Sequence, residues 1–366
     1  MKTSPLLNTA LAAGMLTTTA CAQTSRVYFG TSNSKGIYFS DLDTKTGALT
    51  PPALAAETTG AGFIAIHPNK HMLYSTDIAA FRINSDGTLT LINKLTPKGR
   101  DCCHISIDQT GQCLMAACYG SGSVSAFRIR EDGSLSDLSS YHQHAGSGDH
   151  PQRQTGPHAH SIIPNPANTH AYAPDLGIDK IMIYKLHPGT GTLTEPAFAC
   201  IPGGSMGPRH MKWSTDGSFA YVLNELDLSI SVFRPGKDAG SLVFIRTVST
   251  LPEKADKSDM LSAEIRIHPN GQFIYASNRD LTKQGRDSIS VFTRYEDGFQ
   301  RLGTVPAEVW MPRNFNIDPT GQWMLVGGQW SNDIAIFKVD PATGLLRFTG
   351  TRIPFDGEPI CIEFLD

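Results

Sequence analysis

The chain has 366 residues, a formal net charge of −3 and 40% hydrophobic residues. This balance indicates a soluble globular protein, and the lack of a basic cluster or an aromatic stacking platform argues against a nucleic-acid partner. At 366 residues the chain is long for one ordinary core, a limit that repeated units remove when each buries its faces against its neighbours.

The first segment has the pattern of a secretory signal peptide. Lys2 gives a positively charged start, residues 6–16 are mostly apolar, and an Ala-Cys-Ala run ends at Ala22. The apolar stretch is too short for a membrane span. We therefore predict that residues 1–22 are a signal peptide cleaved after Ala22, with lipoprotein processing at Cys21 as the alternative. Either route predicts a periplasmic or secreted protein.

Seven copies of one pattern follow, in which an apolar strand, a turn rich in Pro, Asp, Asn and Gly, and a second strand succeed one another. Equivalent points of the copies lie 41 to 56 residues apart, at His67, Asp108, Pro164, Ser214, His268, Asp318 and Leu365. A period near 50 that is made only of strands is typical of a propeller with four strands per blade around a central channel. The sequence therefore predicts an all-β, seven-bladed β-propeller.

The fourth copy shows the expected blade most clearly. Its strands are predicted at residues 208–213, 218–224, 229–234 and 241–247, and an Asp-Gly turn joins the first two. The long segments between blades, such as residues 142–156, are expected to be surface loops.

The seventh copy ends after its first strand, at Asp366, while residues 27–31, 36–41 and 48–55 supply three unassigned strands at the other end of the chain. We predict that the C-terminal strand completes the last blade with these N-terminal strands, which removes an open sheet edge. The mature chain, residues 23–366, is then a single domain, and we expect it to be a monomer.

Six cysteines follow Ala22. Cys102 or Cys103 could form a disulfide with Cys113 or Cys118 within one blade, and an exported protein permits this. The interpretation preferred from the sequence is that the cysteines are small buried hydrophobic side chains.

The start of the first strand and the end of the second strand of each blade should meet at the channel mouth, because the two strands are antiparallel neighbours. Aligning the copies places these residues at one equivalent position: Gly62, Cys103, His158, Arg209, Ala263, Arg313 and Ile360. The next position holds Phe63, His104, Ala159, His210, Glu264, Asn314 and Cys361. We expect Glu225, 16 residues after Arg209, to lie within reach of it. Several arginines suit an anionic or oxygen-rich ligand.

Two other interpretations of this ring remain open. Arg209, Glu225 and Arg279 are consistent with a structural role in tying loops and strand ends together. Histidines could also form a metal site, from His104, His158, His160 and His210, although the neighbouring carboxylates are better placed for the arginines.

The motifs in this region resemble those of the seven-bladed propeller lactonases, which include the propeller-type 6-phosphogluconolactonases and the fungal carboxymuconate-lactonizing enzyme. They are Arg153-Gln154, Pro157-His-Ala-His160, Asp175-Leu-Gly177, Pro208-Arg-His210, Asn224-Glu-Leu226, Ser277-Asn-Arg279 and Pro312-Arg-Asn314. The resemblance covers nearly the whole mature chain. It implies a metal-independent site without a cofactor, in which His158 or His160, Arg209, Glu225 and Arg279 are catalytic. The chain departs from the family pattern by an insertion at residues 280–286, which we expect to lie beside the site.

The leading hypothesis is hydrolysis of a sugar lactone or a related small lactone. Arg209 and Arg279 would stabilise the oxyanion, and Glu225 or a histidine would activate water. His104, His210, Arg313 and Asn314 would bind the substrate. The alternatives are closure of a carboxymuconate to a lactone, and a periplasmic binding module without turnover.

Overall fold

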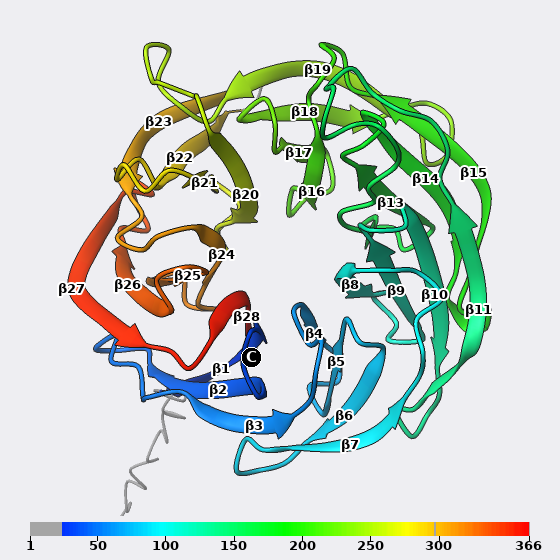
Figure 1. Cartoon of the computed structure of the whole chain (residues 1–366), viewed down its shortest axis with the longest axis horizontal. Helices are drawn as coiled ribbons and strands as arrows, with labels where there is room; N and C mark the ends of the chain where they lie inside the picture. The colour runs from blue at the N-terminus through cyan, green and yellow to red at the C-terminus, as the bar shows by residue number, and fades with distance from the viewer. Residues whose placement is uncertain (1–23, 296–297, 366) are drawn as a thin grey trace, which may run out of the picture.

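The computed structural model describes residues 24–295 and 298–365, so the predicted signal peptide lies outside the described residues. Strands β1 to β28 form seven antiparallel sheets of four strands each, which surround a central channel like the blades of a wheel (Figure 1). The predicted seven-bladed propeller is confirmed. In the described part of the chain, no helix is long and apolar enough to cross a membrane.

Six blades use four strands that follow one another in the chain, and the innermost strand comes first. Blades 1 to 3 consist of β4 (Ile64–Ile66), β5 (Met72–Ser75), β6 (Ala79–Ile83) and β7 (Leu89–Lys94); β8 (Cys102–Ile107), β9 (Cys113–Cys118), β10 (Ser123–Ile129) and β11 (Leu135–Gln143); and β12 (Ile163–Pro164), β13 (His170–Asp175), β14 (Lys180–His187) and β15 (Thr192–Cys200). A short 3-10 helix, η1 (Pro188–Thr190), lies in the outer hairpin of blade 3.

Blades 4 to 6 repeat this order, and blade 4 is the one whose strands the sequence predicts most clearly. They consist of β16 (Pro208–Trp213), β17 (Ala220–Asn224), β18 (Ser229–Pro235) and β19 (Leu242–Ser249); β20 (Met260–Ile267), β21 (Phe273–Asp280), β22 (Ser288–Tyr295) and β23 (Gly298–Pro306); and β24 (Pro312–Ile317), β25 (Trp323–Gly328), β26 (Asp333–Val339) and β27 (Leu346–Pro354).

Blade 7 joins the two ends of the chain. Its strand order is β28 (Glu358–Leu365), β1 (Thr24–Ser32), β2 (Gly36–Asp43) and β3 (Ala53–Glu57). The predicted closure is therefore confirmed. The outer strand begins later than predicted, because Leu49 makes only an isolated bridge with Leu42 before β3 starts.

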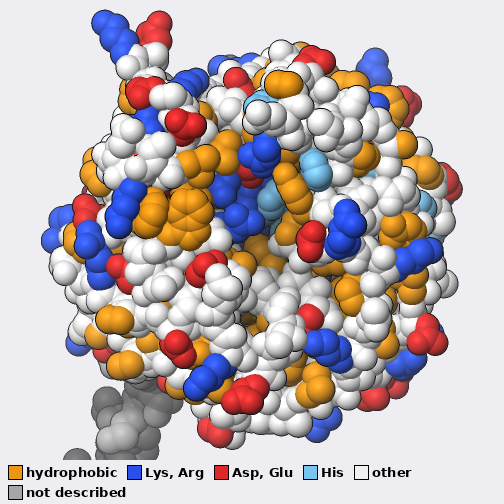
Figure 2. Space-filling model, in the orientation of Figure 1, with side chains coloured by type: hydrophobic (Ala, Val, Ile, Leu, Met, Phe, Trp, Pro, Cys, Tyr) orange, Lys and Arg blue, Asp and Glu red, His pale blue; other side chains and the backbone are white. Residues whose placement is uncertain are grey.

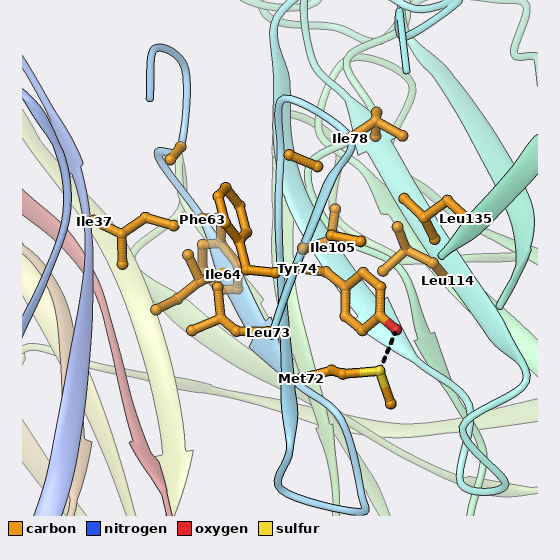
Figure 3. Close-up of a cluster of buried hydrophobic side chains, with 14 of the residues drawn as sticks. Ile37, Phe63, Ile64, Met72, Leu73, Tyr74, Ile78, Ile105, Leu114 and Leu135 are labelled. Atoms are coloured by element: carbon orange, nitrogen blue, oxygen red, sulfur yellow. Dashed lines mark hydrogen bonds between the residues drawn. The ribbon is translucent and has the colours of Figure 1, made fainter. Parts of the chain in front are cut away.

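The apolar cores lie between neighbouring blades. In the cluster of Figure 3, Tyr74 from blade 1 packs with Leu114 and Leu135 from blade 2, and Ile37 belongs to the same cluster from blade 7. Each blade thus buries its faces against its neighbours, which allows a long chain to remain one domain.

Buried tyrosines connect successive blades at their outer side. The hydroxyl of Tyr28 donates to the carbonyl oxygen of Gly87 in the outer hairpin of blade 1, at 3.0 Å. Three further pairs repeat the bond in other blades: Tyr74–Gly133, Tyr172–Gly240 and Tyr275–Gly344. The acceptor Gly87 has a φ of 95°, and a Cβ there would lie 2.5 Å from the ring of Phe39. The hairpin therefore requires glycine at this position.

Candidate functional site

Several first strands carry β-bulges where they enter the channel. In blades 2, 4 and 6 the pairing register skips one residue, and the skipped residues are Cys103, Arg209 and Arg313. A bulge re-aims the side chain of the extra residue. All three residues line one cavity of about 310 Å³. Lys or Arg and His side chains border the central hollow on the face shown in Figure 2.

Arg209 and Glu225 form a buried ion pair at this mouth. Arg209 lies on β16, and Glu225 follows the last residue of the adjacent β17. Arg209 Nε donates to Glu225 Oε2 at 2.8 Å, and the two residues are 2% and 3% exposed. The predicted contact across the 16-residue gap is therefore confirmed. Arg209 Nη1 also donates to the carbonyl oxygen of Ala263.

Two further guanidinium groups converge on the same carboxylate. Arg279, on β21 of blade 5, places Nη2 3.2 Å from Glu225 Oε2 and donates from Nη2 to the carbonyl oxygen of Ser262 at 3.0 Å. Arg153, from the segment between blades 2 and 3, donates from Nη2 to Glu225 Oε1 at 2.7 Å. Both oxygens of Glu225 are thus paired with cations from separate stretches of the chain.

The charges at this mouth follow from these contacts. Burial acts to raise the pKa of Glu225, but Arg279, Arg209 and Arg153 outweigh it and lower the pKa to about 2. Burial, together with the neighbouring arginines, lowers the pKa of Arg279 to about 9. At neutral pH Glu225 is therefore ionised while the surrounding guanidiniums are charged, so the mouth carries excess positive charge.

The alignment of blade 3 predicted from the sequence was wrong by two residues. The amide of Leu176 donates to the carbonyl oxygen of His158, whereas the equivalent bond in blade 4 runs to Gly207, which precedes β16. His160, and not His158, therefore occupies the position equivalent to Arg209. The physical reason is that the inner strand of blade 3 is reduced to β12, so the Pro-His-Ala-His run lies before the regular pairing begins.

The two histidines of this run have different surroundings. His158 stacks on the ring of Tyr119, with centroids 4.3 Å apart, and its Nδ1 lies 2.9 Å from the Tyr119 carbonyl oxygen. His160 is buried, and its Nε2 lies 4.0 Å from Glu225 Oε2. Burial, reinforced by nearby cations, lowers the pKa of His160 well below its usual value, so this imidazole is neutral. His160 is thus the histidine that faces the carboxylate.

A second polar layer lies one residue further along the inner strands. Glu264 is fully buried, its Oε1 lies 3.0 Å from His210 Nδ1, and its other oxygen accepts a bond from Asn314 Nδ2. Burial lowers the pKa of His210 to about 4. His210 lines the cavity, whereas Asn314, predicted to bind substrate, is engaged by Glu264.

His104 belongs to this second layer. Its ring centroid lies 5.3 Å from that of His210 and 4.5 Å from that of Phe63. Burial lowers the pKa of His104 well below its usual value. Over residues 24–295 and 298–365, no group of three or more His, Cys, Asp or Glu side chains is arranged to hold a metal ion.

Arg313 is the cation best placed to meet a ligand. Burial, with Arg209 nearby, lowers its pKa to about 10, so it remains charged at neutral pH. It lines the cavity and, within the described chain, has no hydrogen-bond or ion-pair partner. Other parts of the lining are rich in hydroxyl and amide groups, from Thr31, Ser32, Asn33, Ser34, Thr58 and Thr76.

The preferred interpretation of the cysteines was wrong for one pair. Cys102 and Cys118 form a disulfide, and they are directly paired residues at the mouth ends of β8 and β9. Cys103 stays free, and burial raises the pKa of its thiol to about 11. This pair is one of the alternatives that the sequence leaves open, but no sequence pattern indicates that the two residues face each other.

The sequence predicts no role for Arg153, because residues 142–156 read as a surface loop. The loop is anchored by Gln154, which is 1% exposed and donates from Nε2 to the Leu176 carbonyl oxygen and to Asp179 Oδ1, both at 2.7 Å. This anchor carries Arg153 to Glu225. The Arg-Gln pair was the available signal.

Known proteins resemble this chain over nearly its whole length. The 6-phosphogluconolactonase of Bacillus subtilis (strain 168) is 34% identical over 353 residues, which cover 92% of this chain and 97% of that protein. A 6-phosphogluconolactonase of Formosa agariphila is 33% identical over 326 residues, covering 85% and 90% of the two chains.

Solved structures share the architecture. A crystal structure of a protein from Lactobacillus plantarum superposes with a TM-score of 0.86 at 29% identity, covering 94% of this chain and 100% of that one. The periplasmic gluconolactonase of Pseudomonas aeruginosa has the same fold, with a TM-score of 0.84 at 24% identity and coverage of 94% and 99%. The family described as "Lactonase, 7-bladed beta-propeller" matches residues 26–364. The chain therefore belongs to the seven-bladed β-propeller lactonase family.

Proposed function

We propose that this chain is a lactone hydrolase of the 6-phosphogluconolactonase type that acts at the channel mouth. The observation that carries the proposal is the convergence of Arg153, Arg209 and Arg279 on Glu225, beside a cavity that the unpaired Arg313 also lines. Membership of the lactonase family supports the reaction class.

The arginines of the cavity suit the charge that forms during lactone opening. When water attacks the lactone carbonyl carbon, the carbonyl oxygen gains negative charge, and fixed donors in a site that excludes water stabilise it. Arg209 and Arg313 line the cavity and would face that oxygen. Arg279 and Arg153 would hold Glu225 in place and add positive potential.

His160 is the residue that we assign as the general base. Glu225 is a poor candidate because guanidinium groups occupy both of its oxygens. His210 has both ring nitrogens engaged, Nδ1 by Glu264 and Nε2 by Arg209 Nη1 at 3.2 Å. His160 is neutral and faces Glu225, whose negative charge would stabilise the imidazolium formed when His160 accepts a proton from water.

The cavity supports a small polyhydroxylated substrate. Its volume of about 310 Å³ is at the small end of ligand sites, and its hydroxyl-bearing wall offers partners for sugar hydroxyl groups. We propose a free sugar lactone rather than a phosphorylated one, because we also propose that the chain is exported. The signal peptide predicted at residues 1–22 and the Cys102–Cys118 disulfide support export, since disulfides persist in oxidising compartments.

A lactone panel tests the proposal. The purified mature chain, residues 23–366, should open glucono-1,5-lactone faster than buffer alone, and a muconate substrate should keep its absorbance. Replacing His160 with Gln should lower kcat by about a hundredfold or more, since general-base catalysis contributes that much. The matched variant His158→Gln should retain most activity. Lactone binding without product would instead identify a binding module.

A further inference from the structure

A second cavity lies on the rim of the same face, between blades 5 and 6. Its volume is about 360 Å³, and its lining includes Asp287, Glu308, Trp310, Ser331 and Asp333. It forms where the insertion after β21 meets the segments that precede β24 and follow β25. Hydrophobic side chains border the central basic cluster on this face (Figure 2).

The insertion is built as an ordered platform around Asp280. This residue is fully buried and accepts bonds from the amides of Thr282 at 3.0 Å and Gln284 at 2.8 Å, and from Arg286 Nη2 at 2.9 Å. The Asp280 carbonyl oxygen also accepts a bond from Trp310 Nε1 at 3.1 Å. The loop that interrupts the family pattern therefore fixes the orientation of an indole.

Two indoles form the apolar side of this rim: Trp310 lines the cavity, and Trp330 contacts Trp310. Trp310 and Trp330 meet edge to face, with centroids 5.0 Å apart and ring planes at 77°. Lys283 Nζ lies 4.4 Å from the centroid of Trp310, so the insertion covers that ring. Trp330 is 42% exposed. One indole is thus held by the loop while the second offers a free surface for stacking.

The polar side of the rim carries hydrogen-bond acceptors and charged groups of both signs. Asp287 is 8% exposed, its Oδ1 accepts bonds from the amides of Asp280 and Met311, and burial raises its pKa to about 6. Glu308 is paired with Arg352 at 2.7 Å. The cavity also contains Asp333, Lys283 and Arg352, so hydroxyl groups of a ligand find both acceptors and donors in it.

Hydrogen bonds link the segments next to the rim cavity with the wall of the channel cavity. The amide of Gln329 donates to the Met311 carbonyl oxygen at 2.9 Å, and its side-chain Nε2 donates to Glu358 at 3.0 Å. Glu358 in turn accepts from Ser32 Oγ at 2.6 Å, and Ser32 lines the channel cavity. Arg313 of the channel cavity follows Trp310 of the rim cavity by three residues, so the two Cα atoms lie at most about 11 Å apart. One further sugar ring spans a distance of that order.

We propose that the rim of Trp310, Trp330, Asp287 and Asp333 binds a second pyranose ring, so that this chain acts on aldonolactones that carry a glycosidic substituent. The lactone ring would occupy the channel cavity while the outer ring stacks on Trp330. The kinetic part of this inference rests on the proposed lactone hydrolysis; the binding part does not.

The test compares lactobiono-1,5-lactone, which has two rings, with glucono-1,5-lactone, which has one. The mature wild-type chain should show a lower KM for the two-ring lactone. Trp330→Ala should raise that KM about tenfold, as expected for the loss of one aromatic contact, and leave the KM for glucono-1,5-lactone unchanged. Trp330→Phe should restore most of the difference. The matched control is Phe198→Ala. Phe198 lies on the outer strand of blade 3, is exposed to solvent, and has the Lys180 ammonium over one face of its ring.

Saturation-transfer NMR with lactose separates this inference from the proposed function, because it needs no turnover. Wild-type and Phe198→Ala chains should give a saturable lactose signal. Trp330→Ala should weaken the affinity for lactose about tenfold. A lactose signal that Trp330→Ala leaves unchanged, no saturable lactose signal, or equal KM values for the two lactones in the wild type would overturn the rim site. Lactose binding without lactone opening would support the rim site and reject the hydrolase proposal.

Discussion

Two buried glutamates lie in successive layers of the channel and differ in what holds them. Glu264, in the inner layer, is bonded to neutral or backbone groups, namely His210, Asn314 and the amide of Ile265, and has one guanidinium nearby, that of Arg266 at 3.6 Å. Glu225, at the mouth, is held by three guanidinium groups. The first arrangement satisfies a carboxylate with little excess charge, whereas the second concentrates positive charge around one anion.

This difference separates a layer that supports the structure from one suited to chemistry. Glu264 is 0% exposed, and its partners leave it no free position for a ligand. Of the cations around Glu225, Arg209 lines the cavity at the channel mouth, and Arg153 is partly exposed. We therefore expect changes in the inner layer to affect mainly stability and changes at the mouth to affect mainly turnover.

The largest effect is expected for Glu264→Ala. Removing this carboxylate leaves His210, Asn314 and Arg266 without a buried partner, and the free energy of unfolding should fall by about 3–5 kcal/mol. Urea unfolding measures this change. The matched control is Glu363→Ala, which removes the more exposed carboxylate 2.7 Å from Arg266 and should cost no more than about 1 kcal/mol. Equal losses in the two variants would contradict the supporting role of the inner layer.

The next effect is on catalysis at the mouth. Arg209→Ala should lower kcat for glucono-1,5-lactone by about a hundredfold or more, roughly 2.7–4 kcal/mol of activation free energy, because it removes an oxyanion donor. Arg294→Ala is the control, since this arginine pairs with Asp216 on the outer surface at 2.6 Å. Initial rates corrected for spontaneous opening give the comparison. Turnover that survives in Arg209→Ala would reject the assignment.

Removing the Cys102–Cys118 disulfide tests how far the channel mouth depends on this cross-link. Replacing Cys102 and Cys118 together with Ser opens a bridge between residues 16 apart, and the unfolding free energy should fall by about 2–3 kcal/mol. Because Cys102 lines the channel cavity, the KM for lactone should also rise. Cys113→Ser, at a buried free cysteine of the same strand pair, is the control for KM and should leave it unchanged.

The sequence predicted the features that depend on repetition. The period of the strands predicted the seven blades, and the antiparallel order of β16 and β17 predicted the contact between Arg209 and Glu225. It could not predict what breaks the repeat. The short β12 shifted the register of His158 and His160, and the position of Arg153 depends on the tertiary contacts of Gln154. The facing of Cys102 and Cys118 depends on a bulge that sequence periodicity does not reveal.

The smallest effect expected is a difference in pH dependence between the two layers. Burial keeps the pKa of His210 near 4, below its unfolded value near 6.5, so the unfolded chain binds more protons in that window and stability falls as the pH drops from 6.5 to 4. The pKa of Glu225 is lowered to about 2, so its contribution is complete above about 4.5 and is lost only as the pH falls towards 2.

Urea unfolding between pH 7 and pH 4 separates these contributions. His210→Asn should reduce the slope of unfolding free energy against pH by up to about 1.4 kcal/mol per pH unit, the value for one proton. Glu225→Gln should leave the slope above pH 5 unchanged, because the carboxylate is ionised in both folded and unfolded chains there. His104 and His160 contribute in the same direction as His210, so a residual slope should remain in His210→Asn. A slope that His210→Asn does not alter would mean that the inner layer does not set the acid stability of the propeller.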